Sequence, residues 1–425
     1  MHLENVLSVI LCGAVIKTYG ELNPYADALR RHPWQSEQGY VEVRAGAHMF
    51  YWLYYADGVS IRASTKPLIV WVQGGPGLAA TGVANFAEIG PLNMDMKPRL
   101  HTWVKGRNVL LLDHPVGTGF SYVTNKTLFV KTDHKIAIDL SQAIKCFLKK
   151  HKEFYNTPTY IFGQSYGGKI APRLGYYLST DIKKGKLKMN LKGIGIGSGW
   201  VNPKESSLIY PQYLYNLGVI DKAAFLETRA LVKRLANYID RKEFASASIL
   251  DTKLFQTLIK ESENVNFNNI NKNSPYPDLE SLSVKINRYV KPTLAHVVNQ
   301  SITWNYISDD VFNSLNKSFL VPSTKFLERL LNETKIKVVV YNGNLDVVTP
   351  VAGASNWAHK LNWHGAEEFR KSKRKPITGL RNGYYKTSRQ FSFWWIFGAG
   401  HWVPEDNPVA MRQILDYMIE SDNRI

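Results

Sequence analysis

The sequence predicts an α/β protein with a mostly parallel sheet covered on both faces and a mainly helical insertion in its second half. Short apolar runs, rich in β-branched residues and bounded by turn residues, alternate with helical stretches, a pattern typical of buried parallel strands. The runs are Leu68–Val72, Val109–Leu112, Tyr160–Phe162, Gly193–Ile196, Val338–Tyr341 and Phe391–Phe397. The alternation stops where residues 204–262 become helical in pattern and 264–277 become loop-like, rich in Asn, Ser and Pro. We therefore expect a core of residues 21–202 and 336–425 and an insertion of residues 203–335.

The N-terminus predicts a signal peptide over residues 1–20. The apolar stretch Val6–Ile16 is too short to span a bilayer, and the small residues after it suit cleavage near Gly20. A buried N-terminal segment is the alternative. Sequons at Asn125, Asn299, Asn316 and Asn332 predict glycosylation on a secretory route. We expect a secreted or lysosomal protein without a transmembrane segment, because no apolar run approaches the roughly 20 residues that spanning needs.

The charge and the cysteine content indicate which ligands and which disulfides to expect. The 425 residues include 53 Lys and Arg against 35 Asp and Glu, a net charge of +18. The basic residues are spread along the chain rather than gathered beside aromatics, so we expect no nucleic-acid partner. No cluster has metal-ligand spacing, and we expect neither metal nor cofactor. Cys12 would leave with the signal peptide, so Cys146 could form no intrachain disulfide. The oligomeric state stays open, with a homodimer among the alternatives.

The first core elements are a hairpin over residues 40–56 and the strand Leu68–Val72. Gly74-Gly75-Pro76-Gly77 follows this strand, and its glycines allow backbone N–H groups to approach a reacting carbonyl. We predict that Gly75 supplies one donor of an oxyanion hole. A phosphate-binding loop is the alternative for these glycines, but the segment lacks the Gly-Lys-Ser/Thr ending of such loops.

The strongest chemical signal is Gly163-Gln164-Ser165-Tyr166-Gly167. It lies between a strand pattern and a helical pattern over Lys169–Leu178, the context of a nucleophile elbow. This context favours a nucleophilic Ser165 over an ordinary turn serine. The helix N-terminus favours developing negative charge, and the N–H of Tyr166 would be the second oxyanion donor.

A serine nucleophile needs a general base and an acid that orients the base. In the α/β-hydrolase fold the acid and the histidine follow late strands in that order. Asp346 ends the turn after the strand pattern Ile336–Tyr341, although a turn role alone is the alternative for it. His401 follows the last strand pattern between glycines that free the backbone to place its ring. Ser165, Asp346 and His401 thus form the predicted triad.

Four separated segments resemble the marker sequences of serine carboxypeptidases, in the right order. They are Trp71–Gly77, Asp113–Ser121, Gly163–Gly168 and Gly400–Pro404. The resemblance covers about residues 38–420, and the sequence of Gly46–Trp52 is most similar to the retinoid-inducible branch of the family. It implies an α/β-hydrolase fold with a helical insertion (cap) over the active site. It also implies release of single C-terminal residues from peptide substrates, usually at acidic pH in lysosomes or outside the cell.

The resemblance further implies residues that bind the substrate's terminal carboxylate. The matching positions here are Gln73 with the adjacent Gly74, Glu88 and Gln164, where Gln73 replaces an Asn and Gln164 a Glu of other members. Two close carboxyl groups raise each other's pKa. Because Gln164 removes one of them, we expect Glu88 to ionise more readily and the pH dependence to weaken. The alternative is that Gln164 simply preserves the hydrogen bond.

Three functions fit these residues. The first is a secreted or lysosomal serine carboxypeptidase that works through a Ser-His-Asp acyl-enzyme. The second is an acyltransferase or esterase on the same fold, since an acyl-enzyme can be captured by an alcohol instead of water. The third is a non-catalytic secreted binding protein, which the altered carboxylate-binding residues and the basic charge favour and the intact triad disfavours.

Overall fold

The computed structural model describes residues 23–420 except 33, 59–62 and 380–381. The expected signal peptide therefore lies outside the described residues. The strands form one sheet in the order β1-β2-β4-β3-β6-β7-β8-β11-β10-β9, with β5 paired to β2. Their bounds are β1 Ser36–Arg44, β2 Ala47–Tyr54, β3 Leu68–Val72, β4 Asn108–Leu112, β5 Tyr122–Val123, β6 Pro158–Gln164, β7 Asn190–Gly197, β8 Lys337–Gly343, β9 Lys375–Pro376, β10 Gly383–Ser388 and β11 Phe391–Ile396.

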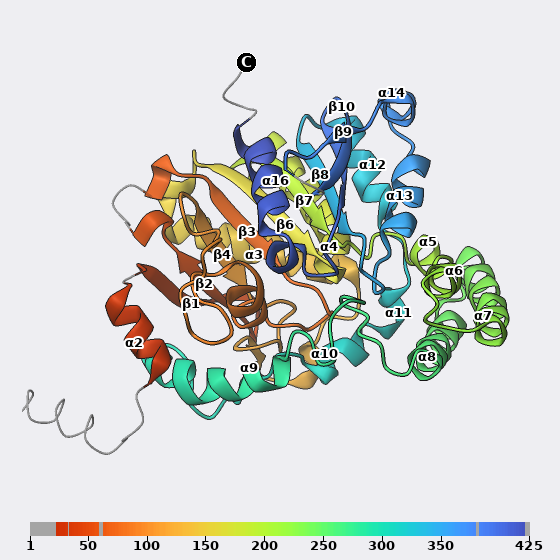
Figure 1. The fold of residues 1–425 in the computed structure, drawn as a ribbon. Helices are drawn as coiled ribbons and strands as arrows, with labels where there is room; N and C mark the ends of the chain where they lie inside the picture. The colour runs from red at the N-terminus through yellow and green to blue at the C-terminus, as the bar shows by residue number, and fades with distance from the viewer. Residues whose placement is uncertain (1–22, 33, 59–62, 380–381, 421–425) are drawn as a thin grey trace, which may run out of the picture.

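The centre of the sheet is parallel and its two ends are antiparallel (Figure 1). The six predicted apolar runs fall in the strands of the parallel ladder β4-β3-β6-β7-β8-β11, except that Phe397 lies one residue beyond β11, and the predicted hairpin is β1–β2. Parallel neighbours bring their carboxyl ends to one edge, so the loops after β3, β6, β8 and β11 meet there. This edge carries the predicted site.

Helices cover both faces of the sheet, as the continuous apolar runs predicted. Along β8, Val338 and Val340 face one hydrophobic core while Val339 and Tyr341 face the other. The first core contains α3, α4, α12, α13 and α14, and the second contains α16. The bounds are α2 Pro24–Arg31, α3 Asp133–Lys150, α4 Tyr166–Lys183, α12 Thr324–Glu333, α13 Val351–Lys360, α14 Ala366–Lys371, α15 Val403–Asp406 and α16 Pro408–Glu420.

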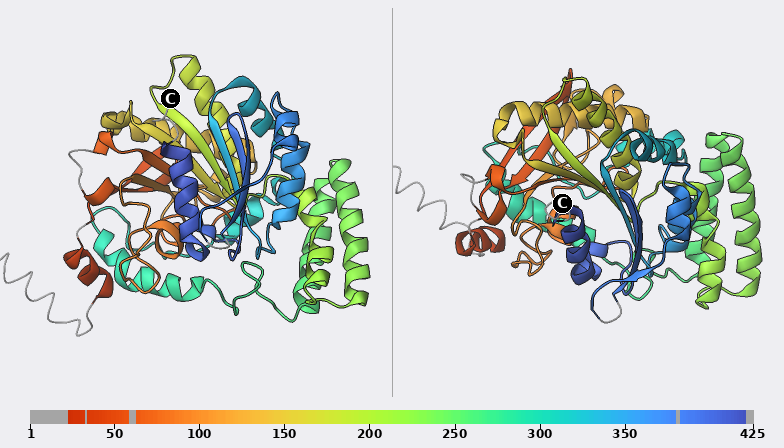
Figure 2. Two further views of the ribbon diagram at one scale, coloured as in Figure 1. Left: turned by 45° about the horizontal axis from the view of Figure 1, so that its top comes forward. Right: turned by 90° about the horizontal axis from the view of Figure 1, so that it is seen from above.

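A long helical segment separates β7 from β8. Its helices are α5 Pro203–Ser207, α6 Tyr210–Asn216, α7 Lys222–Asp240, α8 Phe244–Glu261, α9 Leu279–Lys285, α10 Asp309–Ser314 and α11 Asn316–Phe319, followed by α12. The patterns over 204–262 and 264–277 thus match four helices and a loop. α7 and α8 lie side by side as a hairpin at the flank of the sheet, away from α16 (Figure 2).

Candidate active site

Ser165 lies in the sharp turn from β6 into α4. Its backbone has φ 56° and ψ −122°, a conformation that costs energy for a residue with a side chain. A Cβ on Gly163 would lie 2.3 Å from the carbonyl oxygen of Gly167, and one on Gly167 would lie 1.9 Å from that of Val72. Both glycines are therefore required by close backbone approach. The Ser165 hydroxyl does not cap α4, so this turn has the geometry of a nucleophile elbow.

Asp346 and His401 are in direct contact below the protein surface. The Nδ1 of His401 lies 2.9 Å from Oδ2 of Asp346, and both residues are buried. Thr349 holds the same carboxylate: its N–H donates to Oδ1 at 2.8 Å, and its hydroxyl donates at 2.6 Å to Oδ2, the oxygen that faces His401. The imidazole is thus oriented by an acid that is itself fixed, the arrangement a general base needs. Sequence reasoning missed Thr349.

Backbone contacts join the loops that carry the acid and the histidine. The N–H of Leu345 donates to the carbonyl of Ala399 at 2.9 Å, and a Cβ on Gly343 would lie 2.2 Å from the same oxygen. Gln164, next to Ser165, donates its side-chain N–H to the carbonyl of His401 at 3.0 Å. The structure therefore brings the three predicted triad residues to one edge of the sheet, with Asp346 and His401 hydrogen-bonded and Ser165 linked to them through its neighbour.

The glycine loop after β3 passes directly over the nucleophile. A Cβ on Gly74 would lie 2.6 Å from Cβ and 3.1 Å from Oγ of Ser165, so only glycine fits there. Gly75 has φ +105°, which favours glycine as well. Tyr166 is the first residue of α4, where an N–H has no partner within the helix. Both predicted oxyanion donors thus flank Ser165.

His114 and Asp113 bond to Gln73 and Thr81, on either side of this glycine loop, a role the sequence did not reveal. The Asp113 carboxylate accepts from the N–H and hydroxyl of Thr81 at 2.9 and 2.6 Å and from the N–H of Phe120 at 2.9 Å. Burial raises the pKa of Asp113 to about 6. The ring Nε2 of His114 lies 3.0 Å from the carbonyl of Gln73, and burial lowers the pKa of His114 to about 4. His114 is therefore a neutral support and not a charged participant.

The residues expected to bind a carboxylate form one buried network. Gln73 donates its side-chain N–H to Oε1 of Gln164 at 2.9 Å and to Oε1 of Glu88 at 3.2 Å. Oε2 of Glu88 has no hydrogen-bond partner among the described residues. Burial raises the pKa of Glu88 well above its ordinary value. Desolvation is the main cause of this rise, so burial opposes ionisation of Glu88 even without a second carboxyl. That Glu88 ionises more readily here than in relatives with a paired carboxyl stays a prediction.

The segment between β7 and β8 is fastened to the site by backbone hydrogen bonds. The carbonyl of Asn268 accepts from the N–H of His401 at 2.6 Å, and that of Phe267 accepts from the N–H of Val347 at 3.0 Å. On the glycine loop, Ser308 donates to the carbonyl of Gly77 at 3.0 Å and Ala79 donates to that of Tyr306 at 2.9 Å. The inserted segment thus contacts the acid, histidine and glycine loops. Cys146, on α3, is a free cysteine.

The described residues provide neither a metal site nor a membrane-spanning helix. They contain no group of three or more His, Cys, Asp or Glu side chains that could hold a metal ion. They also contain no helix that is both long and apolar enough to cross a membrane.

Comparison with known proteins assigns the family. The family model of serine carboxypeptidases matches residues 28–421. The chain belongs to the serine carboxypeptidase family. This confirms the resemblance seen in the four marker segments and, with it, the class of enzyme: a serine-type carboxypeptidase.

Individual relatives agree with this assignment. The chain is 34% identical to the retinoid-inducible serine carboxypeptidase of Rattus norvegicus, over 88% of this chain and 90% of that protein. It is 33% identical to serine carboxypeptidase-like 51 of Arabidopsis thaliana, over 96% of this chain and 97% of that protein. Its fold matches a prohormone-processing carboxypeptidase from Saccharomyces cerevisiae with a TM-score of 0.80 at 22% identity, covering 91% and 92% of the two chains. The α/β-hydrolase fold predicted from the sequence is confirmed.

Proposed function

We propose that this carboxypeptidase cleaves the last peptide bond of its substrates through an acyl-enzyme on Ser165. The Oγ of Ser165 attacks the scissile carbonyl carbon while His401 takes the hydroxyl proton. His401 then gives that proton to the leaving nitrogen, and the C–N bond breaks to release the C-terminal residue. Water, activated by the same imidazole, attacks the acyl-enzyme and restores Ser165. The hydrogen bond between His401 and Asp346, at the edge where Ser165 sits in its strained turn, carries this proposal.

The charge that develops during attack needs preorganised donors. We assign this role to the backbone N–H groups of Gly75 and Tyr166, which lie on either side of the nucleophile. Their dipoles are fixed before substrate arrives, because Gly75 lies between Gln73 and Thr81, which bond to His114 and Asp113, and Tyr166 begins α4. No reorganisation is then needed as the oxyanion forms.

The terminal carboxylate of the peptide would bind the network of Gln73, Gln164 and Glu88, beside Gly74. Both N–H groups of Gln73 and one of Gln164 are used by bonds within the protein. The second N–H of Gln164 can donate to the substrate at every pH, and a buried Glu88 that stays protonated can donate its O–H. A protonated acid also avoids repelling the substrate. This proposal predicts carboxylate binding over a wider pH range than a pair of ionising carboxyl groups would allow.

Two further proposals concern the role of the inserted segment and the cellular destination of the protein. We infer that residues 203–335 act as a cap over the site, because their backbone is bonded to all three site loops. We also infer a secretory route, to lysosome or extracellular space, with residues 1–20 removed. The asparagines of the four sequons are all exposed, which suits glycan attachment.

Release of C-terminal residues from a mixed peptide set, followed by mass spectrometry between about pH 4 and 8, tests the proposed function. We expect stepwise trimming that Ser165→Ala abolishes. An organophosphonate that labels the wild-type protein but not Ser165→Ala would locate the nucleophile. Turnover of esters without trimming of any peptide would favour the acyltransferase or esterase alternative. Absence of both labelling and trimming would favour the binding protein.

A further inference from the structure

The inserted segment and the histidine loop meet at one carboxylate, that of Asp406. Asp406 is the last residue of α15, the short helix that follows His401. Its Oδ2 accepts from the backbone N–H of Gly400 at 2.8 Å and from the side-chain N–H of Asn269 at 2.9 Å, and its Oδ1 accepts from the hydroxyl of Tyr276 at 2.7 Å. Gly400 directly precedes His401, whereas Asn269 and Tyr276 belong to the loop after α8. One side chain therefore bonds two segments that are far apart in the sequence.

Asp406 acts here as an acceptor of hydrogen bonds and not as half of an ion pair. The three donors to its carboxylate are neutral groups, and within the described part of the chain no Lys or Arg forms an ion pair with it. Its neighbour Glu405, by contrast, is paired with Arg99. Burial and the Asp406 carboxylate raise the pKa of Tyr276 above its ordinary value, so this hydroxyl keeps its proton. The three bonds thus fix geometry rather than neutralise charge.

The loop that Asp406 holds is organised around the buried side chain of Asn266. Its Oδ1 accepts from the N–H groups of Asn268 at 2.9 Å and Asn269 at 3.1 Å, and its Nδ2 donates to the carbonyl of Tyr276 at 3.1 Å. Asn side chains that bond nearby backbone groups close tight turns. The Asn-rich stretch that the sequence marks only as a loop is therefore an ordered turn, and its shape presents Asn269 to Asp406.

This ordered turn contacts both the histidine loop and the acid loop. The carbonyl of Asn268 accepts from the N–H of His401 at 2.6 Å. A Cβ on Gly400 would lie 2.1 Å from the same oxygen, so only glycine lets the two segments approach this closely. Toward the acid, the N–H of Ile270 donates to the carbonyl of Leu345 at 3.1 Å. The turn therefore connects the two loops whose side chains make the predicted contact between histidine and acid.

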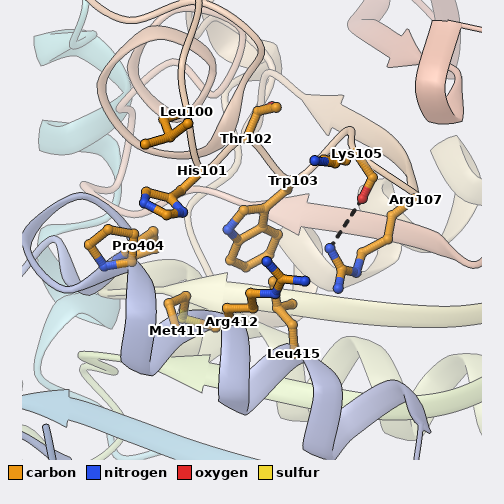
Figure 3. A pocket seen from close by; sticks show the side chains of 11 residues that line it. Leu100, His101, Thr102, Trp103, Lys105, Arg107, Pro404, Met411, Arg412 and Leu415 are labelled. Carbon is orange, nitrogen blue, oxygen red and sulfur yellow. Dashed lines mark hydrogen bonds between the residues drawn. The ribbon is translucent and has the colours of Figure 1, made fainter. Parts of the chain in front are cut away.

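Asp406 itself extends from a helix that is fixed by packing. α15 contacts α16 and the helical turn Val83–Ile89. Pro404 of α15 is buried and lines a pocket together with His101 and Met411 of α16 (Figure 3). The carboxylate is thus held from one side by the second hydrophobic core and bonds the inserted segment on the other.

We propose that Asp406 is a positioning residue for His401, because it joins the inserted turn and the histidine loop into one rigid unit. Without this carboxylate, the N–H of Gly400 and the side-chain amide of Asn269 lose their shared acceptor, and the histidine loop loosens. A displacement of about 1 Å at a reacting group can lower a rate 10²-fold. The inference rests on the proposed function, in which His401 is the general base.

Steady-state kinetics of Asp406→Ala test the proposal. We expect kcat to fall by about 10- to 100-fold while KM changes by less than about threefold, because the chemistry is misplaced and the carboxylate-binding residues stay. The acid limb of the pH–rate profile should move to lower pH, since a looser His401 loses part of its contact with Asp346, which stabilises the protonated ring. Rates are expressed per active site, titrated with an organophosphonate, so that misfolded protein is excluded.

Asp406→Asn is the conservative variant. Its amide oxygen can accept from both donors that now bond Oδ2, and its N–H can donate to the hydroxyl of Tyr276, so kcat should return to within about threefold of the wild type. Asp416→Ala is the matched control. It removes another half-buried carboxylate, which accepts from Arg107 at 3.2 Å in α16, and it should keep the kcat and pH profile of the wild type.

Asn269→Ala removes the donor on the inserted turn and shows whether Asp406 acts through it. Combined with Asp406→Ala it should lower kcat little further, because residues that act through one bond are not additive. Wild-type kcat and pH profile in Asp406→Ala, an Asp406→Asn enzyme as slow as Asp406→Ala, or additive losses in the double variant would each overturn the role of Asp406 alone. A wild-type protein that trims no peptide, or trimming that survives Ser165→Ala, would refute the proposed function and this inference with it.

Discussion

Thr349 is the residue whose contacts most directly fix the predicted acid. Its hydroxyl donates to Asp346 at 2.6 Å and also lies 3.3 Å from Nδ1 of His401. We expect Thr349→Val to lower kcat/KM by about 10- to 100-fold, because a hydrogen bond to a charged group contributes about 1.5–3 kcal/mol. Steady-state kinetics across pH measure the effect, since loss of carboxylate orientation should also move the pH profile.

Thr349→Ser keeps the hydroxyl and is the control for this prediction. It should recover most of the activity. Equal losses in the valine and serine variants, with an unmoved pH profile, would mean that Thr349 only packs against the loop.

Gln164→Glu tests the hypothesis that Gln164 weakens the pH dependence of activity. Its N–H donates to the carbonyl of His401, so Gln164→Glu can keep that bond only while Glu is protonated. As pH rises and this carboxyl ionises, its oxygen would face the carbonyl of His401 and the nearby Glu88. We expect kcat/KM at pH 7.5 to fall by about tenfold or more relative to pH 5.

The double variant Glu88→Gln/Gln164→Glu separates the two carboxyl groups. With Glu88 gone, no second carboxyl opposes ionisation of the new carboxyl at position 164, so the decline should begin at lower pH than in Gln164→Glu. A pH–rate profile of Gln164→Glu that matches the wild type would show that Gln164 is a neutral replacement.

Glu88 should make the stability of the protein depend on pH. Its pKa is raised above the ordinary 4.5 in the folded state, so it is protonated in both states at low pH. Above about pH 4.5 the unfolded chain ionises while the folded one does not, and stability falls as pH rises. We therefore expect Glu88→Gln to raise Tm relative to the wild type by more at pH 7.5 than at pH 4. A constant difference in Tm across this range would contradict the protonated state.

The contrast between Ser165 and Glu88 shows what the sequence could reveal about single residues. Ser165 was recognisable because its glycines and flanking strand and helix are local features. The protonation of Glu88 depends on burial by distant segments, which no local pattern carries. Thr349 lies between these cases: an Asp followed three residues later by Thr is a local side-chain to backbone motif that could have been noticed.

Lys169 connects three elements behind the nucleophile. It is fully buried on α4, lies 3.0 Å from Asp133 of α3 and donates to the carbonyl of Phe319 in α11 at 3.0 Å. Asp133 also accepts from the hydroxyl of Tyr166. We expect Lys169→Met to reduce the free energy of unfolding by about 3–5 kcal/mol, because it leaves a buried carboxylate without its cation. Urea denaturation measures this.

The double variant Asp133→Asn/Lys169→Met removes both charges. It should be more stable than Lys169→Met, since the uncompensated charge is gone. Additive losses in the double variant would show that the two residues do not act as a pair.

Among the secondary-structure elements, the sequence predicted those whose residues follow a regular hydrophobic pattern. It missed the short strands that form only by pairing with a neighbouring strand. The buried strand β8 reads as a continuous apolar run, and both its faces are covered. The two-residue strands β5 and β9 exist only because a neighbouring strand bonds to them, so no period marks them. The backbone contacts of Asn268 with the histidine loop likewise come from an irregular segment, whose course is set by tertiary packing.

The whole molecule offers a test of the secretory route. The asparagines of the four sequons, at 125, 299, 316 and 332, are all exposed. Asn332 donates its side-chain N–H to the carbonyl of Asn362 at 3.2 Å and accepts from the N–H of His364 at 2.9 Å. A glycosylated amide keeps one N–H and its oxygen, so both bonds can persist after modification.

We therefore expect glycans at all four positions when the full chain is expressed in a eukaryotic secretory host. Enzymatic deglycosylation in ¹⁸O water converts each modified Asn to labelled Asp, which peptide mass spectrometry detects. Asn313 is equally exposed but lies outside any sequon, so it should stay unlabelled and controls for spontaneous deamidation. Because the four sites are spread over the surface of one continuous fold, label at none of them in secreted protein would contradict this prediction. Retention of the whole chain inside the cell, with residues 1–20 still attached, would contradict the secretory route itself.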